Sequence, residues 1–249
     1  PPPGAEAPRL DWRSLAPRRG PATETDDGPA VEEGAARAAA SEPDMVDLAR
    51  MQYRADQERY GADDEQVKVS CYNLAFECIA AARRTSVAES GAGRPALLTE
   101  ARDLLEHNLQ IDEKHSGQDS ANYASSLYNL ACVHGELGDC MRMRELMEEA
   151  LRVEVLCSGP NGLEAARTLC GLAAAHTAAP DVPRAREALE GALRIWEALP
   201  PGSRDGKEAP DDVFEELHAL RVALASVCLL GEEAADAARA VTLLSRNLA

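Results

Sequence analysis

The sequence contains few aromatic residues. Phe, Trp and Tyr make up 4% of its 249 residues, and valine and isoleucine are also sparse. Strands are enriched in β-branched and aromatic residues, so this shortage argues against a large sheet. Alanine and leucine supply most of the apolar content, which is 45% of the chain. Because small side chains let helix axes approach each other, we expect closely packed helices.

Long apolar runs are missing as well. No run approaches the roughly 20 residues that a membrane-spanning helix needs, and the first residues lack the apolar core of a signal peptide. We therefore expect an intracellular protein without a membrane span. The cytoplasm or the cilium is the favoured location, and an organelle matrix is the alternative.

Positive charge is in short supply. The formal net charge is -17, and the only lysines are Lys68, Lys114 and Lys207. Binding nucleic acid requires Lys and Arg to neutralise phosphates, so we expect no nucleic-acid partner. A negative surface favours solubility and basic protein partners.

The chain also lacks the motifs of common catalytic and metal sites. It has no phosphate-binding GxxxxGK[ST] loop, no HExxH and no GxSxG. Its seven cysteines form no CxxC pair, and no Cys/His quartet has the spacing of a zinc site. We predict a non-enzyme without metal or cofactor, whose cysteines are reduced core thiols in a reducing compartment. These cysteines are Cys71, Cys78, Cys132, Cys140, Cys157, Cys170 and Cys228.

Residues 1–42 are rich in Pro, Gly, Ala and acidic residues. Leu10, Trp12, Leu15 and Val31 are their few large apolar side chains, too few to offset the chain entropy of folding. We predict an extended low-complexity tail that a partner protein binds, the alternative being that no partner orders it. The expected tail contacts are Arg9, Trp12, Arg13, Arg18 and Arg19.

From about residue 43 the sequence becomes repetitive. Three segments align without gaps, beginning at Gly61, Gly117 and Gly159, and in each the leucine of a Leu-Ala pair follows 13 residues later. Self-similarity of this kind is the signature of a repeat architecture. The pairs are Leu74-Ala75, Leu130-Ala131 and Leu172-Ala173, and a weaker fourth pair is Leu224-Ala225.

The spacing of the pairs predicts repeats of two helices. Leu130 and Leu172 are 42 residues apart, whereas the first and last intervals are longer by 14 and 10 residues. Both excesses fall in Gly- and Pro-containing stretches that read as enlarged turns, which repeat arrays tolerate. An unpaired helix is predicted over 43–60, followed by repeats over about 61–116, 117–158, 159–200 and 209–249. The predicted helices are about 43–59, 64–83, 95–114, 119–137, 139–157, 161–178, 181–198, 210–230 and 233–248.

This pattern resembles the tetratricopeptide repeat (TPR), especially its 42-residue kinesin-light-chain-like form. The resemblance covers about residues 43–248 and departs from the pattern at Met143, where a small residue is usual, and at Pro180, which replaces a turn glycine. It implies an all-α, right-handed α-solenoid of helix-turn-helix repeats. The residues that carry it are Leu130, Ala131, His134, Gly138 and Ala150 in one unit, Leu172, Ala173, His176, Ala185, Leu189 and Ala192 in the next, and Leu74, Ala75, Ala101 and Leu105 in the first.

The resemblance also implies where a partner would bind, because the first helices of such repeats line a concave face. Asn73 and Asn129 are the main candidates, since an amide offers both a donor and an acceptor to a peptide backbone. The alternative is that these side chains pack between helices. In the family, a carboxylate clamp of several Lys, Arg and Asn side chains on the groove binds a free C-terminal carboxylate. This clamp is incomplete here, so we do not expect recognition of a C-terminal carboxylate. The candidate residues are Val69, Tyr72, Asn73, Phe76, Ser125, Tyr128, Asn129 and Arg167.

We therefore predict a non-enzymatic scaffold for protein–protein interaction, acting as a structural subunit of a large intracellular assembly. The cilium, the cytoskeleton and an organelle complex are all possible settings. One alternative is a cargo or peptide adaptor similar to kinesin light chain. A further alternative is an organelle RNA-binding helical-repeat protein, against which the net charge of -17 argues.

Overall fold

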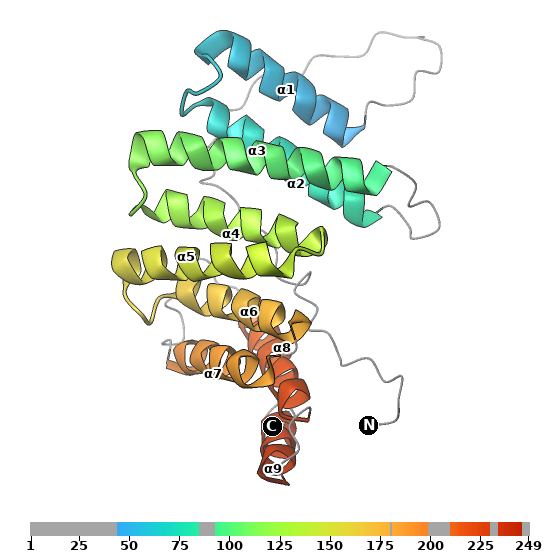
Figure 1. Ribbon diagram of the computed structural model, residues 1–249, viewed down its shortest axis with the longest axis vertical. Coiled ribbons are helices and arrows are strands. Elements are labelled where there is room, and N and C mark those ends of the chain that lie inside the picture. The colour runs from blue at the N-terminus through green and yellow to red at the C-terminus, as the bar shows by residue number, and fades with distance from the viewer. Residues whose placement is uncertain (1–43, 85–92, 180, 199–209, 230–233, 246–249) are drawn as a thin grey trace. The chain divides into compact units, whose positions relative to one another are not determined.

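The computed structural model describes residues 44–84, 93–179, 181–198, 210–229 and 234–245 (Figure 1). These residues form nine α-helices and no strand, which confirms the predicted all-α class. Every helix begins and ends within three residues of its predicted bounds. The predicted tail, with Arg9, Trp12, Arg13, Arg18 and Arg19, lies outside the described residues. The described residues divide into two compact units, and the boundary between them in the sequence falls between Ile111 and Asp112.

The first unit contains three helices. They are α1 (Met45–Tyr60), α2 (Val67–Arg84) and the part of α3 (Gly93–Ser116) that ends at Ile111. α1 packs on α2, and the Cys71 thiol of α2 donates a hydrogen bond to the Leu104 carbonyl oxygen of α3 at 3.1 Å. Leu74 and Ala75 are buried in this unit, as the helical spacing of apolar residues predicts.

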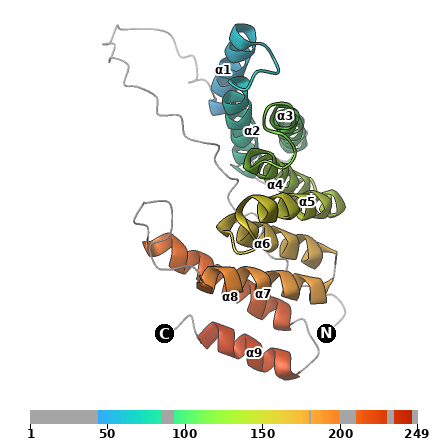
Figure 2. The same ribbon diagram turned by 90° about the vertical axis from the view of Figure 1, so that its left-hand side faces the viewer.

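The second unit contains the remaining helices, which pack in consecutive pairs (Figures 1 and 2). α4 packs on α5, α6 on α7 and α8 on α9, and α5 also contacts α6 as α7 contacts α8. Both Leu-Ala pairs of α4 and α6 are buried, and Ala131 and Ala173 have no exposed surface. Alanine at these places lets the paired helices approach closely. The helices are α4 (Ala121–Glu136), α5 (Cys140–Ser158), α6 (Leu163–Ala178), α7 (Val182–Ala198), α8 (Pro210–Leu229) and α9 (Ala234–Ser245).

The three glycines that the repeats align share a positive φ angle. Gly61, Gly117 and Gly159 follow the ends of α1, α3 and α5, with φ of 92°, 81° and 81°. A side chain is strained at such positive φ, so only glycine adopts it readily. The glycines therefore follow the helix that precedes each aligned segment and let the chain turn into that segment.

Side-chain caps begin at least three of the described helices, including α7, where the Asp181 carboxylate accepts a hydrogen bond from the Arg184 amide at 3.3 Å. The Ser120 hydroxyl accepts a hydrogen bond from the Tyr123 amide of α4 at 3.2 Å, and the Asp139 carboxylate accepts one from the Arg142 amide of α5 at 3.1 Å. Each cap satisfies an amide that has no partner within its own helix. The local sequence thus fixes where the helices of this pair begin.

The structure also bears on two predictions made from the sequence, that the cysteines are core thiols and that no helix spans a membrane. Cys71, Cys78, Cys132 and Cys228 are buried free thiols, as core cysteines should be, whereas Cys157 is exposed. None of the described helices is both long and apolar enough to cross a membrane.

Candidate partner-binding surfaces

One side of α2 presents the four candidate residues of the first repeat. Val69, Tyr72, Asn73 and Phe76 follow the i, i+3, i+4, i+7 spacing that places residues on one helix face. Asn73 is exposed and the other three are half-buried, while Leu74 on the opposite face is buried. This face is called the α2 strip below. It combines accessible apolar area with an amide that can donate and accept hydrogen bonds.

The matching residues of α4 lie deeper. Tyr128 and Asn129 are 1% and 4% exposed, and Ser125 is half-buried. A partner would reach the Tyr128 and Asn129 side chains only after α4 had repacked. Their burial favours the packing alternative for these two residues, and contact with a partner stays a prediction.

Arg167 of α6 is partly exposed and already has an acidic neighbour. Its guanidinium lies 3.6 Å from the Glu164 carboxylate one turn earlier on the same helix. An exposed ion pair of this kind contributes only about 0–1 kcal/mol. Contact between Arg167 and a partner stays a prediction.

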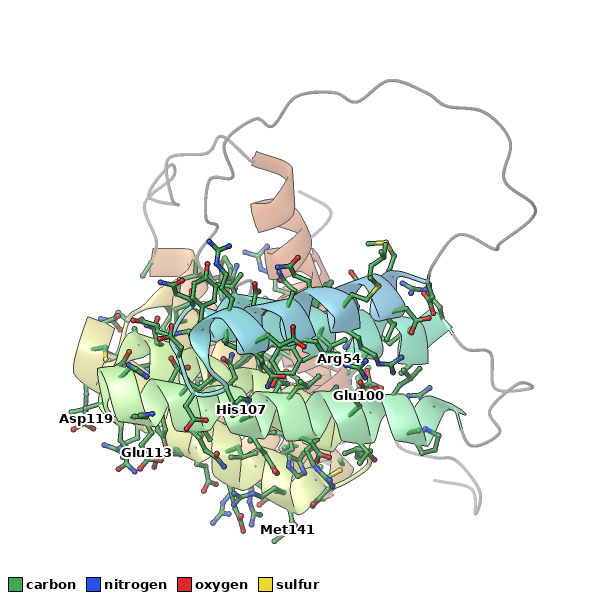
Figure 3. All side chains as sticks on the ribbon, turned by 90° about the horizontal axis from the view of Figure 1, so that it is seen from above. Arg54, Glu100, His107, Glu113, Asp119 and Met141 are labelled. Carbon is green, nitrogen blue, oxygen red and sulfur yellow. The ribbon has the colours of Figure 1, made fainter. Side chains whose placement is uncertain are left out.

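A cleft that the sequence did not predict lies between α1 and α3. It measures about 580 Å³. Figure 3 shows Glu100 and His107 on α3 beside α1. The residues of α3 that line the cleft recur every three or four positions, which is the only sequence signal for it. The lining residues are Tyr53, Ala96, Thr99, Glu100, Asp103, Leu104 and His107.

Polar contacts tie the walls of this cleft together. The Arg50 guanidinium of α1 donates to both oxygens of Glu100, at 2.8 and 2.5 Å, and holds the pKa of that carboxyl below its usual value. The Tyr53 hydroxyl oxygen lies 3.0 Å from His107 Nδ1. His107 Nε2 lies 3.4 Å from Asp63, which precedes α2. These contacts connect α1 to α3 within the first unit.

The ionisation of the cleft residues suits a structural role. Burial is the largest cause of the shift in the pKa of Tyr53, and it raises that pKa. Burial also raises the pKa of the neighbouring Cys71 thiol, to about 12. Both groups therefore stay protonated near neutral pH, whereas a nucleophile needs a lowered pKa. In the part of the chain that the structure describes, no group of three or more His, Cys, Asp or Glu side chains could hold a metal ion.

Known proteins resemble this chain in structure, not in sequence. No protein-family model and no curated protein matches the sequence. Two crystal structures of a candidate kinesin light chain from Podosopora anserina, with nearly identical TPR-like repeats, superpose with TM-scores of 0.59 and 0.56. In both, 18% of residues are identical, over 82% and 81% of this chain and 83% and 86% of the other.

A third structure, BtubC (BKLC) from P. vanneervenii, superposes with a TM-score of 0.55 and 20% identity, over 82% of this chain and 75% of the other. The chain has a TPR-like repeat fold. The sequence-based resemblance is thereby confirmed at the level of the fold. In TPR-like terms, the register of the Leu-Ala pairs predicts that α2, α4, α6 and α8 are the first helices of their repeats, and that α3, α5, α7 and α9 are the second helices.

Proposed function

We propose that this chain is a non-enzymatic scaffold that binds other proteins, as a structural subunit of a large intracellular assembly. Its TPR-like fold supports the general role. The α2 strip carries the proposal, because it leaves Asn73 exposed on a first helix beside the half-buried rings of Tyr72 and Phe76. A basic partner suits the net charge of -17, and nucleic acid does not.

The chemistry of the α2 strip fits an extended peptide segment. The Asn73 amide can bond a peptide N–H and a peptide C=O together, whatever the peptide's sequence. Tyr72, Phe76 and Val69 then supply the apolar area that buries the peptide's side chains. The assembly is proposed to belong to the cilium, the cytoskeleton or an organelle, with the tail of residues 1–42 as a further contact.

Purification of the tagged chain from its own cells tests this role. The unaltered chain should keep its partners through a wash of high salt, because a built-in subunit buries apolar area that salt does not screen. Asn73→Ala should weaken capture of those same partners. Asn122→Ala, which removes an exposed amide from α4, is the matched control and should leave capture unchanged. Equal capture by both variants would exclude the α2 strip as the binding surface.

A cargo or peptide adaptor is the second candidate function. The solved structures described as a kinesin light chain favour it, since their TPR-like repeats superpose on most of this chain. An adaptor of this kind should release its partner in the high-salt wash, yet still lose affinity in Asn73→Ala. The high-salt wash therefore distinguishes an adaptor that binds peptides transiently from a permanent subunit.

A further inference from the structure

The cleft between α1 and α3 has room for a side chain of another protein. Its volume of about 580 Å³ lies within the range of about 300–1,000 Å³ that is usual for sites of small ligands. All of its lining residues belong to the first unit, and none of them belongs to the α2 strip. The cleft is therefore a surface that the proposed function leaves without a role.

Bonds between α1 and α3 hold the walls of the cleft in place. The Arg50 guanidinium of α1 donates to both carboxylate oxygens of Glu100 on α3. The Tyr53 hydroxyl of α1 lies 3.0 Å from Nδ1 of His107 on α3. Figure 3 shows Glu100 and His107 on the side of α3 that lies next to α1. Because these bonds already fix the walls, little ordering entropy is lost when a ligand enters the cleft.

The cleft follows α3 lengthwise and combines apolar surface with an acidic edge. Its lining residues on α3 run from Ala96 to His107, which is about three helical turns. Leu104 is buried and Tyr53 is half-buried, whereas the Asp103 side chain is 60% exposed. A ligand that lies along this cleft therefore needs an apolar stem and a charged end, the combination that long basic side chains have.

The charge of the cleft favours a cation at Asp103. The described lining residues include the carboxylates of Glu100 and Asp103 but no lysine or arginine. Arg50 already occupies both oxygens of Glu100. Asp103 has a weaker partner in its exposed neighbour Arg102, whose two bonds, at 3.0 and 2.6 Å, both reach Oδ1. Asp103 Oδ2 accepts no bond from the residues that the structure describes, so this oxygen is left for a ligand.

We propose that the cleft binds an arginine side chain of a protein partner. The stem of that arginine packs on Leu104 and the Tyr53 ring, and its guanidinium donates to Asp103. Arginine suits this place better than lysine, because its planar group stacks on an aromatic ring and offers a carboxylate two N–H donors. A basic partner also agrees with the net charge of -17. The cleft is thus a second contact surface, beyond the α2 strip.

Threonine methyl NMR of the full chain tests this directly, because Thr99 lines the cleft. Thr168, which has no exposed surface and lies in the second unit, is the internal reference. The probe is a capped tripeptide with arginine between two alanines. The control peptide carries citrulline instead, which keeps the shape of arginine but has no charge. The arginine peptide should shift the Thr99 signal saturably, and the citrulline peptide should not. The Thr168 signal should stay in place with both.

Two variants should change the affinity for the arginine peptide in opposite directions. Asp103→Asn removes the charge and should weaken binding about two- to fivefold, the usual effect of an exposed ion pair. Arg102→Gln removes the guanidinium that competes for Asp103, so it should strengthen binding. Glu58→Gln removes an exposed carboxylate of α1 outside the cleft and is the matched control, which should leave the affinity unchanged. Asn73→Ala should also leave it unchanged, so the cleft and the α2 strip are tested separately.

Three outcomes would overturn the proposal. In the first, the arginine peptide leaves the Thr99 signal where it is, or moves Thr168 as much as Thr99. In the second, the citrulline peptide shifts Thr99 equally, which means that the charge is not recognised. In the third, Asp103→Asn binds the arginine peptide as tightly as the parent does, which places the guanidinium elsewhere. A helical circular dichroism signal equal to the parent's shows that each variant is folded.

Discussion

Within the second unit, the boundaries between successive repeats differ in polarity. At α4, the Ser126 hydroxyl donates to Asp112 Oδ2 at 2.5 Å, and at α6 the Thr168 hydroxyl donates to Glu154 Oε1 at 3.1 Å. In both, the hydroxyl stands four residues before the leucine of the Leu-Ala pair, and the carboxylate 14 residues before the hydroxyl. All four side chains are buried.

At α8 the equivalent places are apolar. Leu220 stands four residues before Leu224, and Trp196 of α7 stands 42 residues after Glu154. Both Leu220 and Trp196 are buried. A repeat boundary can therefore be either polar or apolar. A buried hydroxyl–carboxylate bond demands one alignment of its two helices, whereas apolar side chains accept several, so the polar boundaries should fix the stacking more strictly.

The largest effect should come from placing a lone hydroxyl at the apolar boundary. Leu220→Ser leaves a cavity and supplies no carboxylate partner, so we expect a loss of about 2–5 kcal/mol in the free energy of unfolding. Urea unfolding measures it. Val222→Ser on the same helix, where the side chain is 38% exposed, should stay within about 0.5 kcal/mol. Similar losses in the two variants would contradict an apolar boundary at α8.

Breaking the polar boundary at α6 should have the next largest effect. Thr168→Val keeps the volume but removes the donor to Glu154, which should cost about 1–3 kcal/mol in urea unfolding. Thr177→Val is the control, since that hydroxyl bonds only the Ala174 carbonyl oxygen of its own helix, at 2.8 Å. A loss no larger than the control's would mean that the bond to Glu154 adds nothing.

Converting the α6 boundary to the type at α8 should restore stability. In Thr168→Val with Glu154→Leu both polar groups are gone, and apolar replacements of both partners are often close to neutral. The double variant should therefore be more stable than Thr168→Val alone. A double-mutant cycle measures the coupling, expected at about 0.5–3 kcal/mol. Additive single effects would show that the two residues act independently.

The stability of the boundaries at α6 and α8 should also differ in its dependence on pH. His176 follows Leu172 of α6 by four residues, and Cys228 takes that place in α8. Burial lowers the pKa of His176 below its ordinary value. The unfolded chain therefore binds the proton first, and stability should fall as the pH drops below about 6.5. Calorimetric melting between pH 7.5 and 5.5 should show a smaller fall for His176→Gln, and an equal fall would assign the effect elsewhere.

The smallest effect is expected in the first unit, where the Arg50–Glu100 link is about one third exposed. Glu100→Gln should cost about 0.2–1 kcal/mol at pH 7. Because Arg50 lowers the pKa of Glu100, this contribution is present above the ordinary carboxyl pKa and lost as the pH falls through the lower value in the folded chain. Variant and parent should therefore converge in urea unfolding at acid pH. A constant difference would contradict an ionic contribution.

The sequence predicted the helices because their signals are local. The Leu-Ala pairs are small and apolar where helices cross, and the aligned glycines adopt a backbone that side chains disfavour. Both properties can be predicted from residue type and spacing alone. The TPR-like fold followed from their repetition.

Burial at the candidate site did not follow from spacing. Asn73 and Asn129 occupy the same place in their repeats, yet the first is exposed and the second buried. That difference depends on which helices surround each residue, and the repeat pattern is the same for both. The hydrogen bonds of Ser126 and Thr168 were not predicted from the sequence. In both, an acidic residue stands 14 positions before the hydroxyl, but this spacing gains meaning only when the pairing of the helices is known.

Site-specific photo-crosslinking tests the central claim, that the α2 strip binds a protein partner. A photo-reactive amino acid replaces Asn73 in one variant and Gln110, an exposed residue of α3, in the other. In cells that make this protein, the account predicts one discrete crosslinked species from position 73, reduced by Tyr72→Ala and missing from position 110. The same crosslinks from both positions, or none from position 73, would contradict it.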